Sequence, residues 1–365
     1  MSDLKSHLQD MWEYIESIMP GDLGKIAEET GALVRRKGVG SAVELLRIIL
    51  MYGVTDLSLK ATAAWASATG IGRLSSVALF YRVRDSREWL SRLVAGMLQV
   101  QAAPSACSGL NVSIVDATVL VGPGAKGTEW RLHTGIDPVT GHINSVKLTD
   151  ASVGESYSNY PIRAGDVVVG DRAYALATGI AHVHKRGGYT VARANLHSIR
   201  LCRRDGSIFQ PLSEVSKIPK VGVARYDILI PTPPAKRSRS HKPWKLTDAS
   251  DWIPARLLAV RTHKNTFIWV ITTVPESMAS DVVIMELYRV RWQIELEFKR
   301  LKSLLGLDAV PSRRGPTAES WILARILAAI LVEELLRDSG VFSPWGYYMP
   351  GQSVAGQSGA VSFAA

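Results

Sequence analysis

The chain has 365 residues, of which 47% are hydrophobic and ten are tryptophan, so it can bury a large core. That composition excludes a disordered protein and is typical of two or three folded domains. Its 43 Lys and Arg residues against 33 Asp and Glu residues give a net charge of +10, which favours a polyanionic partner, although a merely basic soluble protein has the same balance.

Residues 1 to about 100 are predicted to be helical, because their apolar residues recur at helical spacing. The first twenty residues carry acids where a signal peptide needs a basic segment, so none is expected. The stretch LSLKATAAWASATGIGRLSSVALFYRVRD contains a helix, a break at Gly70 and Gly72, and a second helix from near Ser75. This outline fits a helix-turn-helix, whose second helix enters a DNA groove, and equally an ordinary pair of packed helices.

The pattern changes to strands after a linker at residues 101–109. LNVSIVDATVL predicts a strand containing Asp116, and WRLHTGIDPVTGHINSVKLTD predicts two strands joined by a DPVTG turn. GDVVVGDRAYA predicts a buried strand ending at Asp171, followed by a helix and a strand at GYTVARAN. Three antiparallel strands, a fourth strand and a helix predict an α/β core with a mixed sheet. Cys107 and Cys202 have no metal-ligand spacing and exclude a disulfide framework, which predicts a reducing cytoplasm.

Residues 196–274 are predicted to form an all-β insertion with strands at ARYDILI, ARLLAVRT and TFIWVITTV. A basic loop without acids, PTPPAKRSRSHKPWK, separates the first two strands and is either a phosphate contact or a solvated surface. Its lysines and arginines are Lys236, Arg237, Arg239, Lys242 and Lys245. The apolar stretch from Trp321 is interrupted by Arg325 and Glu333, and predicts a buried or amphipathic helix, not a membrane span.

A further helix is predicted from an N-cap at Ser280 or Asp281 to near Gly306. At roughly 100° per residue, one apolar stripe contains Leu287, Val290, Ile294, Leu301 and Leu305. A neighbouring polar sector contains Tyr288, Arg291, Glu295 and Lys302. Glu297 falls on the edge of the apolar stripe, so the two glutamates are not equivalent.

Three acids occupy positions at which a metal site would need them. Asp116 lies inside a strand, Asp171 ends a strand at the edge where α/β sheets present ligand-binding groups, and Glu295 projects from the polar sector of the helix. Mg²⁺ prefers oxygen ligands, and one carboxylate cannot hold two ions. Each acid also has a structural explanation: a hydrogen bond within the strand, a helix cap, or pairing with Lys299.

The spacing Y-x2-R-x3-E-x6-K of Tyr288, Arg291, Glu295 and Lys302 resembles the YREK signature of insertion-sequence-four-type DDE transposases, which are bacterial cut-and-paste enzymes. VDATVL and VVVGDRAYA are similar to the segments that carry the first and second aspartates of that family. The resemblance covers residues 105 to 335, and the order of the acids and the β-strand insertion agree with it. The N-terminal third is similar only in being a helical DNA-binding region.

The resemblance implies an α/β fold with a ribonuclease-H-like mixed-sheet core. In that core Asp116, Asp171 and Glu295 would be catalytic and would hold two Mg²⁺ ions, with Mn²⁺ as a substitute. Arg291 and Lys302 would hold the DNA backbone, and Tyr288 would contact a phosphate or a flipped base. The implied division is a helical DNA-binding domain at 1–104, core segments at 105–195 and 275–340, the insertion at 196–274 and a flexible tail at 341–365.

The function implied is a transposase that binds the terminal inverted repeats of an insertion sequence, cleaves the DNA ends and joins 3′ ends to target DNA. Its partners would be double-stranded DNA and a second copy of the chain in a homodimeric synaptic complex. It would act in the bacterial cytoplasm, at the nucleoid when bound, and not at a membrane. Two alternatives stay open: a ribonuclease-H-like nuclease without strand transfer, and a transposase-derived DNA-binding repressor without catalysis.

Overall fold

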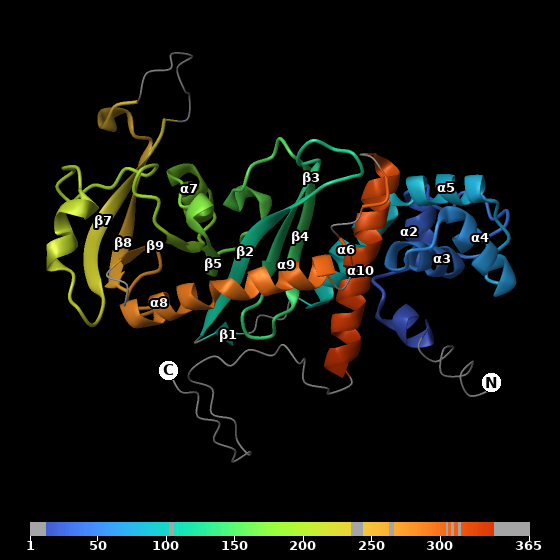
Figure 1. Ribbon diagram of the computed structural model, residues 1–365. Coiled ribbons are helices and arrows are strands. Elements are labelled where there is room, and N and C mark those ends of the chain that lie inside the picture. The colour runs from blue at the N-terminus through green and yellow to red at the C-terminus, as the bar shows by residue number, and fades with distance from the viewer. Residues whose placement is uncertain are drawn as a thin grey trace, which may run out of the picture.

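The structure is a computed structural model that describes residues 12–101, 106–107, 109–234, 244–262, 266–303, 306–307, 310–312 and 315–338. Figure 1 shows a central sheet with a group of N-terminal helices beside it. The named α-helices are α2 (Leu23–Glu29), α3 (Ala42–Val54), α4 (Leu59–Ala68), α5 (Ser76–Asp85), α6 (Arg87–Gln101), α7 (Ala177–His184), α8 (Asp281–Arg289), α9 (Gln293–Ser303) and α10 (Pro316–Asp338). The strands are β1 (Ala106–Cys107), β2 (Leu110–Leu120), β3 (Trp130–Ile136), β4 (Ile143–Asp150), β5 (Asp166–Gly170), β6 (Tyr189–Arg193), β7 (Ala224–Thr232), β8 (Asp251–Arg261) and β9 (Phe267–Thr272).

Serine residues begin four of the helices, because a serine oxygen accepts a hydrogen bond from an N–H group that the first helical turn leaves unpaired. The Oγ atoms of Ser41, Ser58, Ser75 and Ser280 each accept from the backbone N–H three residues later. The predicted helical N-terminal region, the predicted second helix from Ser75 and the predicted N-cap at Ser280 are therefore confirmed.

The described strands form one mixed sheet in the order β4-β3-β2-β5-β6-β9-β8-β7, with β1 paired to β2. Strands β2, β3 and β4 are antiparallel, whereas β5 runs parallel to β2, and β6 runs parallel to β5. The turn between β3 and β4 is the predicted DPVTG segment, in which Gly141 has a φ of +72° that few other residues tolerate. This topology confirms the predicted mixed-sheet core.

The strands predicted for residues 196–274 extend this same sheet, because β9 pairs with β6 and is followed by β8 and β7. Four of the five predicted basic loop residues lie outside the described residues, and Lys245 alone lies within them. The predicted tail at 341–365 also lies outside them. The domain boundaries stay a prediction.

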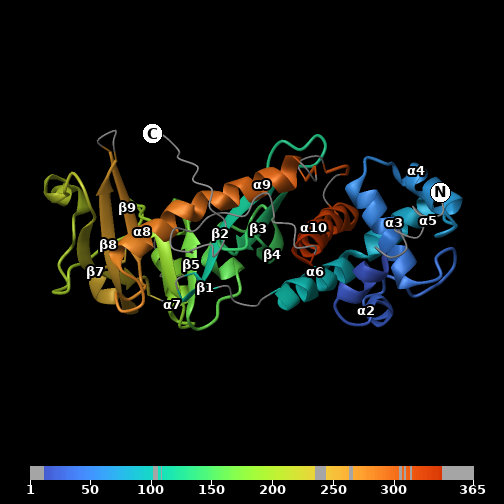
Figure 2. The same cartoon turned by 90° about the horizontal axis from the view of Figure 1, so that it is seen from below.

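Different layers cover the two faces of the sheet (Figures 1 and 2). Helices α8 and α9 cross one face, where α9 packs against β2 and α8 packs against β5, β6 and β9. Buried residues of these helices, such as Leu287 and Ile294, share one hydrophobic cluster with Ile114 and Val169 of the sheet. On the other face, α7 and three tyrosines pack against Val115 and Val168 in a separate cluster.

Helix α10 joins the N-terminal helices to the sheet. It packs against α3, α5 and α6, and the approach to α3 is so close that a Cβ at Gly53 would lie 2.7 Å from the Cβ of Ala324. At its other end, Glu333 accepts a hydrogen bond from the backbone N–H of Ile143 at the start of β4. Its residues from Trp321 to Leu331 are almost all buried, as the sequence predicts. Among the described helices, none combines the length and apolar character that a membrane crossing requires.

Candidate active site

The two predicted aspartates lie on or directly after neighbouring parallel strands. The register between β2 and β5 pairs Ile114 with Val169, Asp116 lies two residues further along β2, and Asp171 directly follows β5, which ends at Gly170. Neighbouring strands are about 4.8 Å apart, and residues separated by two positions share a face. Asp116 therefore lies on the face shared by Ile114 and Val169, which is the face that α9 crosses, and Asp171 is close enough for its charge to act on Asp116.

Each aspartate accepts one local backbone hydrogen bond. The Oδ1 atom of Asp116 lies 2.8 Å from the N atom of Ala117, and the Oδ1 atom of Asp171 lies 2.7 Å from the N atom of Ala173. Asp171 thereby caps a short 3₁₀ turn, Arg172–Tyr174, which follows the strand. Asp116 and Asp171 therefore do form the local hydrogen bonds that a purely structural role would require. These bonds do not prevent the two carboxylates from also lying near each other.

Burial is the main cause that raises the pKa of Asp116 to about 6, and the hydrogen bond from Ala117 opposes it. The negative charges of Asp171 and Glu155 raise this pKa further, whereas the positive charge of Arg291 lowers it. The interactions identify the groups that surround Asp116: two acids and one arginine. A bound cation would relieve the repulsion among these carboxylates.

The predicted uninterrupted helix from Ser280 is wrong at its centre. A 3₁₀ turn at Val290–Trp292 separates α8 from α9 and contains Arg291. A 3₁₀ turn advances about 120° per residue, so side chains on either side of it are rotated relative to an ideal α-helix. The described part of α9 ends at Ser303, and residues 304 and 305 lie outside the described residues.

The two glutamates of α9 differ as predicted. Glu297 is 4% exposed, whereas the side chain of Glu295 is 60% exposed. The Oε1 atom of Glu295 lies 2.8 Å from the Nη2 atom of Arg291, which is 18% exposed. Arg291 thus forms an ion pair with Glu295, and its positive charge also lowers the pKa of Asp116.

The remaining signature residues flank this ion pair. The Arg291 guanidinium lies 6.0 Å from the ring centroid of Tyr288, which is half-buried. Burial lowers the pKa of Arg291, but its hydrogen bond to Glu295 and its interaction with Tyr288 leave that pKa raised overall. Lys302 is half-buried two turns beyond Glu295, at the end of α9.

The site contains carboxylate oxygens, which suit a hard cation such as Mg²⁺. In the part of the chain that the structure describes, however, three carboxylates do not converge on one point. Within the described ranges, no group of three or more His, Cys, Asp or Glu side chains is placed to hold a metal ion. Asp116 and Asp171 supply oxygen ligands of the type that Mg²⁺ prefers. Thr134, opposite Asp116 on β3, has a buried hydroxyl without a hydrogen-bond partner in the described part of the chain. A buried hydroxyl of this kind is suited to form a hydrogen bond with a water molecule bound to a cation.

Sequence reasoning missed Glu155 and Tyr160. Glu155 is half-buried in the loop after β4, where burial raises its pKa, Asp171 raises it further and Arg131 opposes the shift. The hydroxyl of Tyr160 donates a hydrogen bond of 2.7 Å to the backbone oxygen of Asp116. Neither residue has a spacing signal in the sequence, because only the tertiary fold brings this loop to the ends of β2 and β5.

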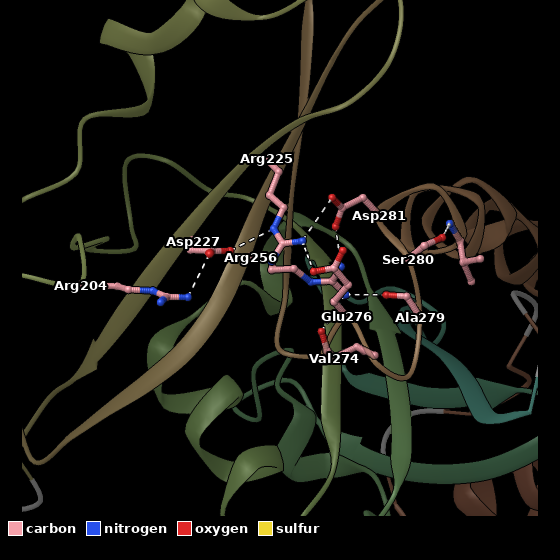
Figure 3. Close-up of polar contacts among 10 residues, drawn as sticks. Arg204, Arg225, Asp227, Arg256, Val274, Glu276, Ala279, Ser280 and Asp281 are labelled. Carbon is pink, nitrogen blue, oxygen red and sulfur yellow. Dashed lines mark hydrogen bonds and ion pairs between the residues drawn. The ribbon is translucent and has the colours of Figure 1, made fainter.

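The start of α8 is anchored by a charged network (Figure 3). Arg256 of β8 is 5% exposed and donates to the backbone oxygens of Val274 and Ala279, at 2.8 and 2.9 Å. It also pairs with Asp281 in the first turn of α8. Arg225 of β7 is 30% exposed and pairs with Asp227 at 3.0 Å and with Glu276. The network therefore ties the outer strands of the sheet to the helix that leads into the signature residues.

Comparisons with known proteins show the family of the chain. Residues 108–331 match the family described as Transposase DDE domain. The chain is 31% identical to InsL of insertion sequence element IS186A of Escherichia coli K12, over 93% of this chain and 97% of that protein. It is 30% identical to the transposase for insertion sequence element IS421 of Escherichia coli, with the same coverage. A piggyBac transposase synaptic complex with hairpin DNA has a TM-score of 0.46 and 10% identity, over 86% of this chain and 72% of that one. The chain therefore belongs to the DDE transposase family of bacterial insertion sequences.

Proposed function

We propose that this transposase binds the terminal inverted repeats of an insertion sequence, cleaves the DNA ends and joins the 3′ ends to target DNA. The observation that carries the proposal is the placement of Asp116 and Asp171 side by side beneath a helix that bears Glu295 and its signature neighbours. The family match and the strand order support the same conclusion.

Asp116, Asp171 and Glu295 are the residues proposed to hold two Mg²⁺ ions, with Mn²⁺ as a substitute. Bound ions of this kind supply positive charge that stabilises an in-line displacement at phosphorus. For Glu295 to join the aspartates, its side chain has to leave the ion pair with Arg291. That exchange releases the Arg291 guanidinium to bind a DNA phosphate, next to Lys302 and Tyr288.

Helix α5 offers a surface for DNA. Val77, Phe80, Tyr81 and Arg84 follow the i, i+3, i+4, i+7 spacing of one helical face, and the three apolar ones are exposed by 62%, 39% and 48%. The Arg84 guanidinium lies 4.7 Å from the Tyr81 ring centroid, and Phe80 meets Tyr81 edge to face. A face of aromatic and cationic side chains on a capped helix suits a DNA groove.

A basic loop is fixed beside this helix. Arg82 of α5 donates to the backbone oxygens of Ala32 and Arg35, and the N atom of Arg73 lies 2.7 Å from the oxygen of Gly38. Residues 32–38 and 73–84 contain no acid, and their cations are Arg35, Arg36, Lys37, Arg73, Arg82 and Arg84. Two of these cations have acidic partners outside the ranges: Arg36 pairs with Glu28 at 3.2 Å, and Arg84 pairs with Asp85 at 2.7 Å. This charge distribution favours the helix-turn-helix interpretation over a pair of helices with no partner.

We expect the two parts of this surface to affect DNA binding differently. Tyr81→Ala should reduce the preference for terminal-repeat over scrambled duplex by about tenfold, as loss of a base contact does. Arg35→Gln with Lys37→Gln should weaken binding to both duplexes equally and lower the salt slope by about 1 per lost phosphate contact. Fluorescence anisotropy over a range of salt concentrations measures both effects.

Lys217→Gln provides a control outside this surface. It removes one positive charge, whereas the double variant removes two, and it does so at a residue of the insertion that is paired with Glu214 at 2.8 Å. It should leave the affinity, the preference and the slope unchanged. An unchanged preference in Tyr81→Ala, together with an unchanged slope in the double variant, would show that α5 and its loop do not contact DNA.

The proposal includes the remaining parts of the organisation inferred from the sequence. The helical residues 1–104 bind the DNA ends, the two core segments cut them, and two copies of the chain hold two ends together in the synaptic complex. The protein acts in the bacterial cytoplasm, on DNA of the nucleoid.

Strand transfer tests the function directly. A duplex bearing the terminal repeat that flanks the coding region, incubated with the protein, Mg²⁺ and a target plasmid, is expected to give cleaved ends and joined products. Cleavage without joined products would support the nuclease alternative. Specific binding without cleavage would support the repressor alternative, and either result would contradict the transposase proposal.

A further inference from the structure

A layer of three tyrosines lies beneath the two aspartates, on the face of the sheet opposite α9. Tyr157, Tyr160 and Tyr174 form one buried cluster with Val115 and Val168, and none of the three is more than 6% exposed. The rings of Tyr157 and Tyr174 have centroids 5.1 Å apart, and those of Tyr160 and Tyr174 are 6.0 Å apart. The layer is therefore a packed block and leaves its members little freedom to move.

The hydroxyl groups of this layer form a chain with a defined direction. Tyr160 Oη lies 2.7 Å from the backbone oxygen of Asp116 and 2.7 Å from Tyr174 Oη. A carbonyl oxygen only accepts, so Tyr160 uses its single proton on Asp116. Tyr174 must then donate to Tyr160, and the chain runs from Tyr174 through Tyr160 to the main chain of Asp116. Hydrogen bonds in series strengthen one another in a buried environment.

The same layer packs against the end of β5, directly before Asp171. Gly170 immediately precedes Asp171, and a Cβ at Gly170 would lie 2.8 Å from Tyr157 Oη and 2.8 Å from the Cβ of Tyr174. The backbone of β5 thus rests directly on two tyrosine side chains. One tyrosine cluster therefore contacts the main chain at Asp116 and directly before Asp171, from the face of the sheet opposite α9.

We propose that Tyr160 is a positioning residue of the active site, whose hydroxyl fixes the main chain of Asp116 so that this carboxylate meets a cation shared with Asp171. The inference rests on the proposed function, since it assigns a role within that metal site. Mg²⁺ demands oxygen ligands at 2.0–2.1 Å in near-ideal geometry, so a small displacement of one carboxylate weakens the site. Groups that orient a ligand typically change metal affinity or activity by 10–100-fold when they are removed.

The test compares Tyr160→Phe with Tyr174→Phe in the full chain. Each variant removes one hydroxyl from the same block, but only Tyr160→Phe removes the bond to Asp116. Mn²⁺ binding, followed by electron paramagnetic resonance in the absence of DNA, should weaken by about 10–100-fold in Tyr160→Phe and much less in Tyr174→Phe. Cleavage at saturating DNA should require correspondingly more Mn²⁺ in Tyr160→Phe, with the affinity for DNA unchanged.

Thermal melts separate positioning from a general loss of structure, because both variants lose a buried hydroxyl and should melt at similarly lowered temperatures. Equal Mn²⁺ affinity in Tyr160→Phe and the unmodified protein would overturn the inference while leaving the proposed function intact. Equal weakening in both variants would also overturn it, since the block as a whole would then be responsible. An unmodified protein that binds no Mn²⁺ would contradict the metal site itself, and with it this role of Tyr160.

Discussion

Cleavage of a terminal-repeat duplex with Mg²⁺ is expected to fall by a factor on the order of 10³ or more in Asp116→Asn, Asp171→Asn and Glu295→Gln. Each amide keeps the size and polarity of the acid but lacks the anionic oxygen that a hard cation prefers. Folding and DNA binding should be retained, because none of these carboxylates is proposed to contact the DNA ends. A gel shift and a thermal melt verify this, and a time course of nicking measures the cleavage.

Glu297→Gln is the matched control. It makes the same chemical change two residues further along α9, but its side chain is buried on the packed side of the helix. Cleavage should therefore persist, and any loss of stability will appear in its melt. Normal cleavage by Glu295→Gln with none by Glu297→Gln would reverse the assignment of the two glutamates. Normal cleavage by all the acid variants would rule out the carboxylate site.

The free energy of unfolding of Asp116→Asn, measured against pH, provides a second test. Burial raises the pKa of Asp116 from 3.8 to about 6 in the folded protein. Between these two values the carboxyl group is protonated in the folded state and ionised in the unfolded chain. The contribution of Asp116 to the free energy of unfolding is consequently largest at low pH and declines as the pH rises from 4 to 6. Above that range the buried charge destabilises the fold, and Asn should be more stable by about 2 kcal/mol at pH 7. The advantage should vanish below roughly pH 3, where Asp116 is protonated in both the folded and the unfolded state.

The positions of the aspartates could be predicted because the strand patterns that contain them are local. LNVSIVDATVL and VVVGD each have enough β-branched residues to predict a strand, but their parallel pairing is a long-range contact that these patterns do not predict. The helix with Glu295 could be located from its cap and its apolar stripe. The 3₁₀ turn at Val290–Trp292 could not, because the segment contains no glycine or proline that would indicate a break in the helix.

Contacts between distant segments are the part that the sequence did not predict. The pairing of β9 with β6 merges the insertion strands into the core sheet, but their pattern fits a separate sheet equally well. Glu155 and Tyr160 reach the aspartates from a loop whose residues have no regular period. The ion pair between Arg291 and Glu295 depends on side-chain rotamers, which the spacing of the signature leaves open.

Arg256→Met is expected to lower the free energy of unfolding by about 3–5 kcal/mol, the range for removing one partner of a buried ion pair. Its guanidinium is almost fully buried and contacts Asp281 together with the backbone oxygens of Val274 and Ala279, as Figure 3 shows. Methionine fills most of the volume of the side chain but donates no hydrogen bond. The carboxylate of Asp281 and both carbonyl oxygens would then lose a charged donor in a site with little access to water.

Arg225→Met serves as the comparison within the same network, because Arg225 is 30% exposed and pairs with Asp227 and Glu276 at the surface. Exposed ion pairs contribute about 0–1 kcal/mol, so this variant should unfold at nearly the denaturant concentration of the unmodified protein. Urea unfolding followed by circular dichroism distinguishes the two. Equal losses in both variants would mean that the buried contacts of Arg256 are not what holds the first turn of α8 against the sheet. A selective loss in Arg256→Met, accompanied by slower cleavage under conditions in which the variant is folded, would show that the outer strands help to place the signature residues over Asp116 and Asp171.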